Sequence, residues 1–269
     1  MTRPLPYVKG HGTENDFVVI PDLDGELSLT PDDVRRICDR RSGIGADGIL
    51  RVVRSDHDPE ARAMAGTAPW FMDYRNADGS IAQMCGNGAR VFARYLVDTG
   101  LVPSGAIRLA TRHGVREVQV PTVGDVTVDM GQAVLGEMIV LDGAPARLVD
   151  MGNPHAVVQV PSVAALGVLA PSRSDLNVEY VEDTGPASLS MRVHERGVGE
   201  THSCGTGACA AVVATATRHA TERGTPHAVT VPGGHLVVTW CGDGRVLLAG
   251  PAVLVASGDI RADWLEGCV

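Results

Sequence analysis

Short runs of apolar residues, many alternating with polar ones, recur along the whole of this chain. β-Branched residues are frequent in these runs, and glycine or polar clusters bound them, which is typical of β-strands. The clearest runs are residues 17–20, 49–53, 126–130, 156–160, 189–193 and 236–240. The pattern therefore predicts a fold with many short strands.

Three segments carry a helical pattern instead. Residues 30–33 combine a threonine suited to the N-cap, a proline for the first helical position and an acidic first turn, and helical spacing continues to Arg41. A second helix is predicted from Cys85 to Gly100. A third begins at Cys204, and because residues 210–216 are apolar nearly all round, we expect it to be buried.

The second and third helices begin with nearly the same residues. Residues 84–89 read Met-Cys-Gly-Asn-Gly-Ala, and residues 203–208 read Ser-Cys-Gly-Thr-Gly-Ala. A Gly/Asn stretch leading into a β-branched run also occurs in each half, at residues 11–20 and 151–160. Duplication of one α/β unit explains these similarities.

The duplication predicts an α+β protein of two pseudo-symmetric domains, each a curled, mostly antiparallel sheet around its own central helix. We expect the first domain to span residues 1–131 and to be completed by the C-terminal segment 250–269. The second domain is expected at residues 132–249. In this arrangement the openings of the two helices meet in a cleft.

Composition narrows the class of ligand. The chain has 269 residues and a net charge of −9, with no run of Lys or Arg, so neither nucleic acid nor a membrane is an expected partner. It has no signal-peptide pattern and no apolar run near the roughly 18 residues that span a bilayer. We therefore expect a cytoplasmic protein that binds a small, zwitterionic molecule.

Cys85 and Cys204 are the candidate catalytic residues. At the first turn of a helix, backbone N–H groups and the positive end of the dipole favour a thiolate, whereas apolar burial raises a thiol pKa. Inversion of a stereocentre by proton transfer needs a base on one face and an acid on the other. A thiolate and a thiol supply that pair.

Backbone N–H groups are the candidate stabilisers of the carbanion that forms when an amino acid loses its α-hydrogen. Those of Gly86, Asn87, Gly205 and Thr206 lie at the two helix openings. Aimed at one substrate carboxylate, they stabilise the developing charge without a cofactor. No Cys/His spacing in the chain resembles a zinc site, so no metal is expected.

Six motifs, in order, resemble diaminopimelate epimerases, and together they cover essentially the whole chain. They are Asn15-Asp16-Phe17, residues 76–80 (Asn-Ala-Asp-Gly-Ser), Cys85-Gly86-Asn87-Gly88, Gly152-Asn153-Pro154-His155, Glu195-Arg196-Gly197 and Cys204-Gly205-Thr206-Gly207. The resemblance implies a cofactor-independent isomerase that interconverts L,L- and meso-diaminopimelate, on the route to lysine and peptidoglycan. It also implies a homodimer.

The same resemblance implies roles for individual residues. Cys85 would deprotonate the L,L isomer and Cys204 would protonate the opposite face, with the roles exchanged in reverse. His155 and Glu195 would tune the thiols, and Glu195 and Arg196 would supply both charges for the distal end of the substrate. The amides expected to hydrogen-bond the substrate are those of Asn15, Asn76, Asn153 and Asn177.

Two positions depart from the family pattern. Glu14 stands where the family usually has glycine, and Gly48 stands where many members have glutamine. The first change adds a charge beside a substrate asparagine, and the second removes an amide. Both affect the expected substrate contacts and leave the cysteines in place.

Two other functions compete with this interpretation. A relative of proline racemase or hydroxyproline epimerase would share the two-thiol plan, but a cyclic substrate with one amino group and one carboxylate would leave Glu195, Arg196 and the asparagines without a distal partner. A thiol redox switch would instead join Cys85 and Cys204 in a disulfide. We interpret such a disulfide as an inactivated state.

Overall fold

The computed structural model describes residues 4–265, which divide into two compact units. The first contains the chain up to Gly12, Asp16–Val126 and the chain from Ala252 onward, and the second contains Thr13–Asn15 and Thr127–Pro251. The C-terminal segment thus packs with the first unit. The boundaries expected from the sequence, after residues 131 and 249, stay a prediction of where the domains end.

The first unit is a sheet with helices, and its strands follow the order β17-β1-β2-β3-β4-β5-β6. Its strands are β1 (Leu5–Gly12), β2 (Asn15–Pro21), β3 (Gly48–Arg54), β4 (Trp70–Asn76), β5 (Gly105–Thr111), β6 (Gly114–Val120) and β17 (Val253–Ile260). Its helices are α1 (Pro31–Cys38), α2 (Gly86–Asp98) and α4 (Ala262–Leu265), with 3₁₀ turns at Ser55–His57 and Arg62–Met64.

The second unit is a sheet around one helix, with the strand order β8-β9-β10-β11-β12-β14-β15-β16-β7, and β13 pairs with β12. Its strands are β7 (Val126–Gln132), β8 (Val134–Leu141), β9 (Ala144–Asp150), β10 (Pro154–Gln159), β11 (Asn177–Gly185), β12 (Ser188–Glu195), β13 (Gly199–Thr201), β14 (Pro226–Val231), β15 (Gly234–Trp240) and β16 (Arg245–Gly250). Its helix is α3 (Gly205–Arg218).

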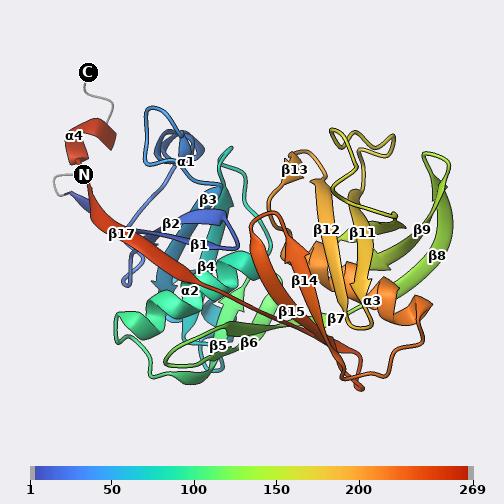
Figure 1. The fold of residues 1–269 in the computed structure, drawn as a ribbon. Coiled ribbons are helices and arrows are strands. Elements are labelled where there is room, and N and C mark those ends of the chain that lie inside the picture. The colour runs from blue at the N-terminus through green and yellow to red at the C-terminus, as the bar shows by residue number, and fades with distance from the viewer. Residues whose placement is uncertain (1–3, 266–269) are drawn as a thin grey trace. The chain divides into compact units, whose positions relative to one another are not determined.

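The two units repeat one connectivity. In the first, β2 and β3 are parallel, β3 and β4 antiparallel, β4 and β5 parallel, and β5 and β6 antiparallel. In the second, β10, β11, β12, β14 and β15 show the same alternation in the same order. The long helix follows the third strand of each series (Figure 1). The predicted duplicated α+β fold is confirmed.

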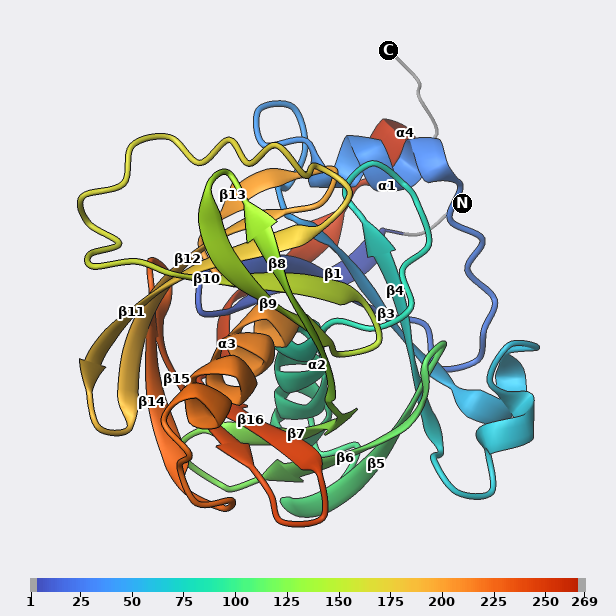
Figure 2. The same ribbon diagram turned by 90° about the vertical axis from the view of Figure 1, so that its right-hand side faces the viewer.

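Each long helix packs inside its own sheet. Helix α2 contacts β1, β3, β4, β6 and β17, whereas α3 contacts β9–β12 and β14–β16 (Figures 1 and 2). Residues 86–96 of α2 and almost all of residues 205–216 of α3 are buried. The prediction that the apolar third helix is buried is confirmed, and the start of each long helix is fixed by contacts on several sides.

Helix α1 starts as the sequence predicts and ends earlier. The Thr30 hydroxyl accepts the N–H of Asp33, and the Asp33 carboxylate accepts the N–H of Thr30, which is a capping box. The chain leaves the helix at Asp39, which is extended. The returning loop then donates to the last turn, from Ile44 to the carbonyl of Ile37. This tertiary contact replaces the helical hydrogen bonds that were expected as far as Arg41.

No helix within residues 4–265 is both long enough and apolar enough to cross a bilayer.

We expect Thr30→Ala to destabilise the protein by about 1 kcal/mol, because the Asp33 N–H loses its cap acceptor. Urea unfolding measures the change in the free energy of unfolding. Ser28→Ala, an exposed position before the helix, is the matched control and should leave that free energy within about 0.5 kcal/mol of the original. Equal effects from both variants would contradict the role of the cap.

Candidate active site

Cys85 is the N-cap residue of α2. Its backbone is extended (φ −137°, ψ 122°), and its sulfur accepts the N–H of Gly88 at 3.4 Å. The side chain is half-buried. Gly88 is also close-packed, since a Cβ there would lie 3.2 Å from Leu50 Cδ2 and 3.5 Å from Phe17 Cζ. The thiol therefore lies at the positive end of a buried helix, as predicted.

Cys204 occupies the same place on α3. Its backbone has φ −118° and ψ 116°, and its sulfur accepts the N–H of Gly207 at 3.4 Å. Only 6% of Cys204 is exposed, so it is more deeply buried than Cys85. A Cβ at Gly207 would lie 2.7 Å from Glu179 Oε1. The glycine three residues after the cysteine thus makes room for a carboxylate here and for apolar groups in the first unit.

The strand pairing shows which residue around Cys85 in the first unit is equivalent to which residue around Cys204 in the second. In the first unit Phe17 pairs with Gly48, and in the second His155 pairs with Asn177. We call the residues around Cys85 the first half-site and those around Cys204 the second half-site. The equivalent positions are Asn15 and Asn153, Phe17 and His155, Gly48 and Asn177, Leu50 and Glu179, Asn76 and Glu195, and Cys85 and Cys204.

Glu195 lies against the Cys204 thiol. The Glu195 carboxyl group is hydrogen-bonded to Cys204, and it also accepts a hydrogen bond from the Thr201 hydroxyl. Burial raises the pKa of Glu195, and the negative charge of Glu179 adds to this effect. The hydrogen bonds from Thr201 and Cys204 oppose the shift. Glu195 is therefore the carboxyl group that is hydrogen-bonded to the Cys204 thiol.

The Cys204 thiol is held in its protonated form. Burial raises its pKa well above the usual range, and the charges of Glu195 and Glu179 raise it further. Hydrogen bonds from the Thr206 hydroxyl and the Gly207 N–H act in the opposite direction. The helix N-terminus favours a thiolate, but at this position desolvation and the two carboxylates outweigh it.

His155 is fully buried and connects two other polar residues. Its Nδ1 lies 2.6 Å from Glu179 Oε1, and its Nε2 lies 3.1 Å from Asn153 Oδ1. The Asn153 amide reaches Thr206 Oγ1 at 3.5 Å, and that hydroxyl lies 3.5 Å from Cys204 Sγ. A chain of polar contacts therefore runs from the Glu179 carboxylate to the Cys204 sulfur.

Asn177 makes hydrogen bonds within the second half-site, whereas Arg196 presents its side chain to solvent. The Asn177 side chain donates to the Pro154 carbonyl at 3.0 Å and accepts the N–H of Arg196 at 3.0 Å, so it ties together two segments of the second half-site. Arg196 is exposed, and within residues 4–265 its guanidinium makes no hydrogen bond or ion pair. This cation is available to a ligand carboxylate.

The predicted residues of the first half-site lie at the ends of their elements. Asn76 ends β4, and its amide donates to the Ser80 hydroxyl at 3.0 Å inside a turn. Gly86 and Asn87 form the first turn of α2, where backbone N–H groups have no helical carbonyl to bind. Gly205 and Thr206 hold the same place on α3.

Asn15 starts β2, and the turn before it packs with the second unit. The Thr13 hydroxyl lies 2.6 Å from that of Ser203, and a Cβ at Gly233 would lie 2.0 Å from the Thr13 carbonyl oxygen. Both Thr13 and Glu14 have positive φ values, 51° and 62°. This left-handed turn explains the preference for glycine at position 14. Here the Glu14 carboxylate instead contacts His202 Nδ1 at 2.8 Å.

Gly48, the other departure from the family pattern, lies in a tight part of the sheet. A Cβ at this position would meet the Arg75 carbonyl oxygen at 2.5 Å and Tyr74 Cε2 at 2.8 Å. The strands therefore approach too closely for a larger side chain without a shift. The amide that Gly48 lacks is present at the equivalent position of the second unit, as Asn177.

Sequence reasoning missed two residues of the second half-site, Glu179 and Thr201. Glu179 lies within the apolar run 178–181, where a single acid is easily taken for a solvent-facing position. Its full burial becomes visible only with the register of β11 and the packing of Gly207. Thr201 lies six residues from Glu195, on the short strand β13, and carried no motif.

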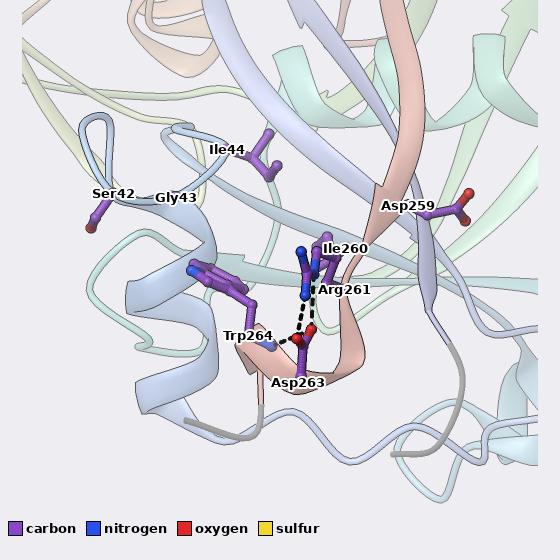
Figure 3. Close-up of a pocket in the computed structure, with 8 residues that line it drawn as sticks. All are labelled: Ser42, Gly43, Ile44, Asp259, Ile260, Arg261, Asp263 and Trp264. Atoms are coloured by element: carbon purple, nitrogen blue, oxygen red, sulfur yellow. Dashed lines mark hydrogen bonds and ion pairs between the residues drawn. The ribbon is translucent and has the colours of Figure 1, made fainter. Parts of the chain in front are cut away.

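A pocket of about 360 Å³ in the first unit lies apart from these residues (Figure 3). It is bounded by the loop at Ser42–Ile44 and by residues 259–264, and Arg261 and Asp263 pair with each other across hydrogen bonds. It contains none of the predicted site residues. Within residues 4–265 no cluster of three or more His, Cys, Asp or Glu side chains has the spacing of a metal site.

Comparison with known proteins identifies relatives over nearly the full length. A profile of the family described as diaminopimelate epimerase matches residues 7–136 and 147–255. The diaminopimelate epimerase of Streptomyces coelicolor is 53% identical, over 99% of this chain and 99% of that protein. Among solved structures, a PhzF-family protein of Bacillus anthracis matches with a TM-score of 0.75 at 15% identity, covering 96% of this chain and 99% of that one.

A hydroxyproline epimerase from Agrobacterium vitis matches with a TM-score of 0.69 at 14% identity, covering 97% of this chain and 93% of that one. At these low identities both solved structures show the fold alone.

We expect Glu195→Gln to lower the pKa of Cys204, because the substitution removes a negative charge that opposes the thiolate. The thiolate absorbance, recorded as a pH titration with and without an added Cys204→Ala change, isolates the Cys204 contribution. Glu200→Gln, which removes an exposed carboxylate paired with Arg192, is the control and should leave the titration unmoved. A Cys204 titration that stays in place or moves to higher pH in Glu195→Gln would contradict the assignment.

Proposed function

Since the chain belongs to the diaminopimelate epimerase family, we propose that it interconverts L,L- and meso-diaminopimelate by a cofactor-independent two-base reaction of Cys85 and Cys204. The observation that carries this proposal is the repeated half-site, in which each cysteine caps a buried helix above a glycine that donates to its sulfur. The product serves the synthesis of lysine and peptidoglycan precursors.

In the direction from L,L to meso, Cys85 acts as the base and Cys204 as the acid. The high pKa of Cys204 supports this assignment, because an acid must hold its proton before the reaction begins. The Cys85 thiolate takes the α-proton, and the electron pair left on the α-carbon is delocalised into the carboxylate. The Cys204 S–H bond then delivers its proton to the opposite face. In reverse, the roles of the two sulfurs exchange.

The first turns of α2 and α3 supply the stabilisation of the carbanion. Backbone N–H groups at Gly86, Asn87, Gly205 and Thr206 are fixed by the burial of their helices, and glycine lets the chain approach a carboxylate closely. These donors need no reorganisation when the charge forms. No electron-withdrawing cofactor enters the proposed reaction.

Glu195 and His155 adjust the proton on Cys204. Glu195 shares a hydrogen bond with the thiol, so it can accept the thiol proton when Cys204 must serve as the base. His155 reaches the same thiol through Asn153 and Thr206. Both residues are thereby assigned to the thiol, and the distal charge that the sequence suggested for Glu195 is not part of the proposal.

Substrate selection rests on charges and amides beyond the reacting carbon. Arg196 offers an exposed guanidinium for the distal carboxylate, because a guanidinium binds a carboxylate through two parallel hydrogen bonds. Asn15, Asn76 and Asn153 offer amides that both donate and accept. Asn177 positions two of the segments that carry these groups, because its side chain is hydrogen-bonded to the backbone of Arg196 and of Pro154.

We also propose a homodimer, which rests on the family resemblance, and a cytoplasmic location, which rests on the sequence pattern. Light scattering on the purified protein measures the first, and cell fractionation measures the second.

We expect the protein, reduced and free of pyridoxal phosphate, to form meso-diaminopimelate from the L,L isomer in deuterium oxide with deuterium at the α-carbon. NMR follows both events in one tube. L-Proline and trans-4-hydroxy-L-proline should neither exchange nor invert under the same conditions. Inversion of a proline with no reaction of diaminopimelate would instead favour the proline racemase-like alternative.

We expect Cys85→Ala and Cys204→Ala each to lower the epimerisation rate by about 10²–10⁴-fold, because each loses one proton-transfer group. Deuterium incorporation separates the roles. Cys204→Ala should still exchange the L centre without inverting it, and Cys85→Ala should exchange only the D centre of the meso isomer. Circular dichroism confirms folding, and Cys241→Ala, which changes a cysteine in the turn after β15 and outside both half-sites, is the control. Exchange at the wrong centre would reverse the assigned faces.

A further inference from the structure

Glu179 is a fully buried carboxylate that takes part in no proton transfer of the proposed reaction. Its Oε1 lies 2.6 Å from His155 Nδ1, and its Oε2 has no hydrogen-bond partner within residues 4–265. Burying a carboxylate with one oxygen unsatisfied costs free energy. Such a group is retained in a folded protein only where the surroundings compensate for it or the function needs it.

The duplicated unit shows that the fold itself does not need this group. At the positions equivalent to His155 and Glu179, the first unit has Phe17 and Leu50, which are both fully buried and packed against Gly88. The same connectivity and the same kind of helix opening thus form around an apolar pair. Replacement of a buried ion pair by packed apolar residues is often neutral or stabilising.

The packing of α3 accommodates the carboxylate specifically. Gly207 is the third residue of the helix, and a Cβ there would lie 2.7 Å from Glu179 Oε1 and 3.2 Å from its Cγ. The Gly207 N–H also donates to Cys204 Sγ. One glycine therefore holds the thiol and leaves space for the carboxylate next to it.

The contacts of His155 indicate that Glu179 orients its ring. A carboxylate oxygen at 2.6 Å from Nδ1 requires the ring to donate from that nitrogen, which fixes the ring orientation and turns Nε2 toward Asn153. Asn153 and Thr206 continue the contact to Cys204. A carboxylate behind a functional histidine is a recurring way of fixing its orientation.

We propose that Glu179 is a positioning residue for the second half-site: it holds the His155 ring so that Asn153 and Thr206 connect that ring to the Cys204 thiol. The proposal rests on the proposed function for its kinetic consequence, but the arrangement of His155 can be measured without turnover. Because Leu50 and Phe17 replace the pair at the first half-site, Glu179 is one of the residues that make the surroundings of the two cysteines different.

Two titratable groups interact with this pair: Glu195 on β12 and Cys204 at the start of α3. The charge of Glu179 acts on both, and that of His155 acts on Glu195. Changes at Glu179 therefore report on His155, Glu195 and Cys204 together. A signal from the ring nitrogens of His155 isolates the contact that the proposal names.

The test is Glu179→Leu, which installs the residue found at the equivalent position of the first unit. We expect it to fold, to lower kcat by about 10–100-fold and to leave KM within about twofold, because an orienting contact is lost while the substrate contacts remain. In ¹H–¹⁵N NMR of the resting protein, the hydrogen-bonded Nδ1–H signal of His155, assigned with a His155→Phe sample, should disappear.

Two further variants serve as a conservative substitution at the same position and as a matched control. Glu179→Gln keeps an acceptor oxygen and should retain the Nδ1–H signal with a kcat between those of the wild type and the leucine variant. Glu182→Gln, on the same strand but bonded to the Val163 N–H, is the matched control and should change neither readout. An unchanged kcat and an unchanged His155 signal in folded Glu179→Leu would overturn the proposal.

If the leucine variant does not fold, a Glu179→Gln protein that loses the His155 Nδ1–H signal and still has the wild-type kcat overturns it. If the wild type fails to epimerise diaminopimelate, the proposed function fails, and the ring signal alone still supports or overturns the contact.

Discussion

The hydrogen bond from a glycine N–H to the sulfur of the N-cap cysteine is the contact on which both half-sites depend. It fixes Cys85 to Gly88 and Cys204 to Gly207, each at 3.4 Å. The burial of α2 and α3 in their sheets makes this contact rigid, because each helix opening is held from several strands. Rigid positioning matters for proton transfer, since a base must lie within hydrogen-bond reach of the proton that it removes.

Duplication explains why these contacts occur twice, and divergence explains why they are not identical. The same strand pairs and the same helix position recur in the two units. The duplicated connectivity therefore places each cysteine at the N-terminus of a helix. The neighbours then differ: Cys204 faces Glu195 and Glu179, whereas Asn76 and Leu50 stand at the equivalent positions around Cys85. Charge, not backbone geometry, separates the two half-sites.

Much of this arrangement could be predicted from the sequence, and the failures have physical causes. The Cys-Gly-x-Gly-Ala repeat predicted both helix openings because the residues that form a cap are local in the chain. The early end of α1 depends on hydrogen bonds from a returning loop, which local spacing toward Arg41 does not encode. Glu179 was missed for a similar reason, since its burial depends on the β11 register and on space left by Gly207.

In the proposed two-base reaction, one sulfur must carry a proton and the other must not when the substrate binds. If both sulfurs were thiols there would be no base, and if both were thiolates there would be no acid. Desolvation and two carboxylates favour the proton on Cys204, which is why the proposed reaction assigns this sulfur as the acid in the L,L to meso direction. After turnover the charge has moved to Cys204, the sulfur that bears the higher cost of ionisation. Glu195, hydrogen-bonded to that sulfur, is then a group through which a proton can return to Cys204, and the starting state is restored once Cys85 has also released the proton that it took from the substrate.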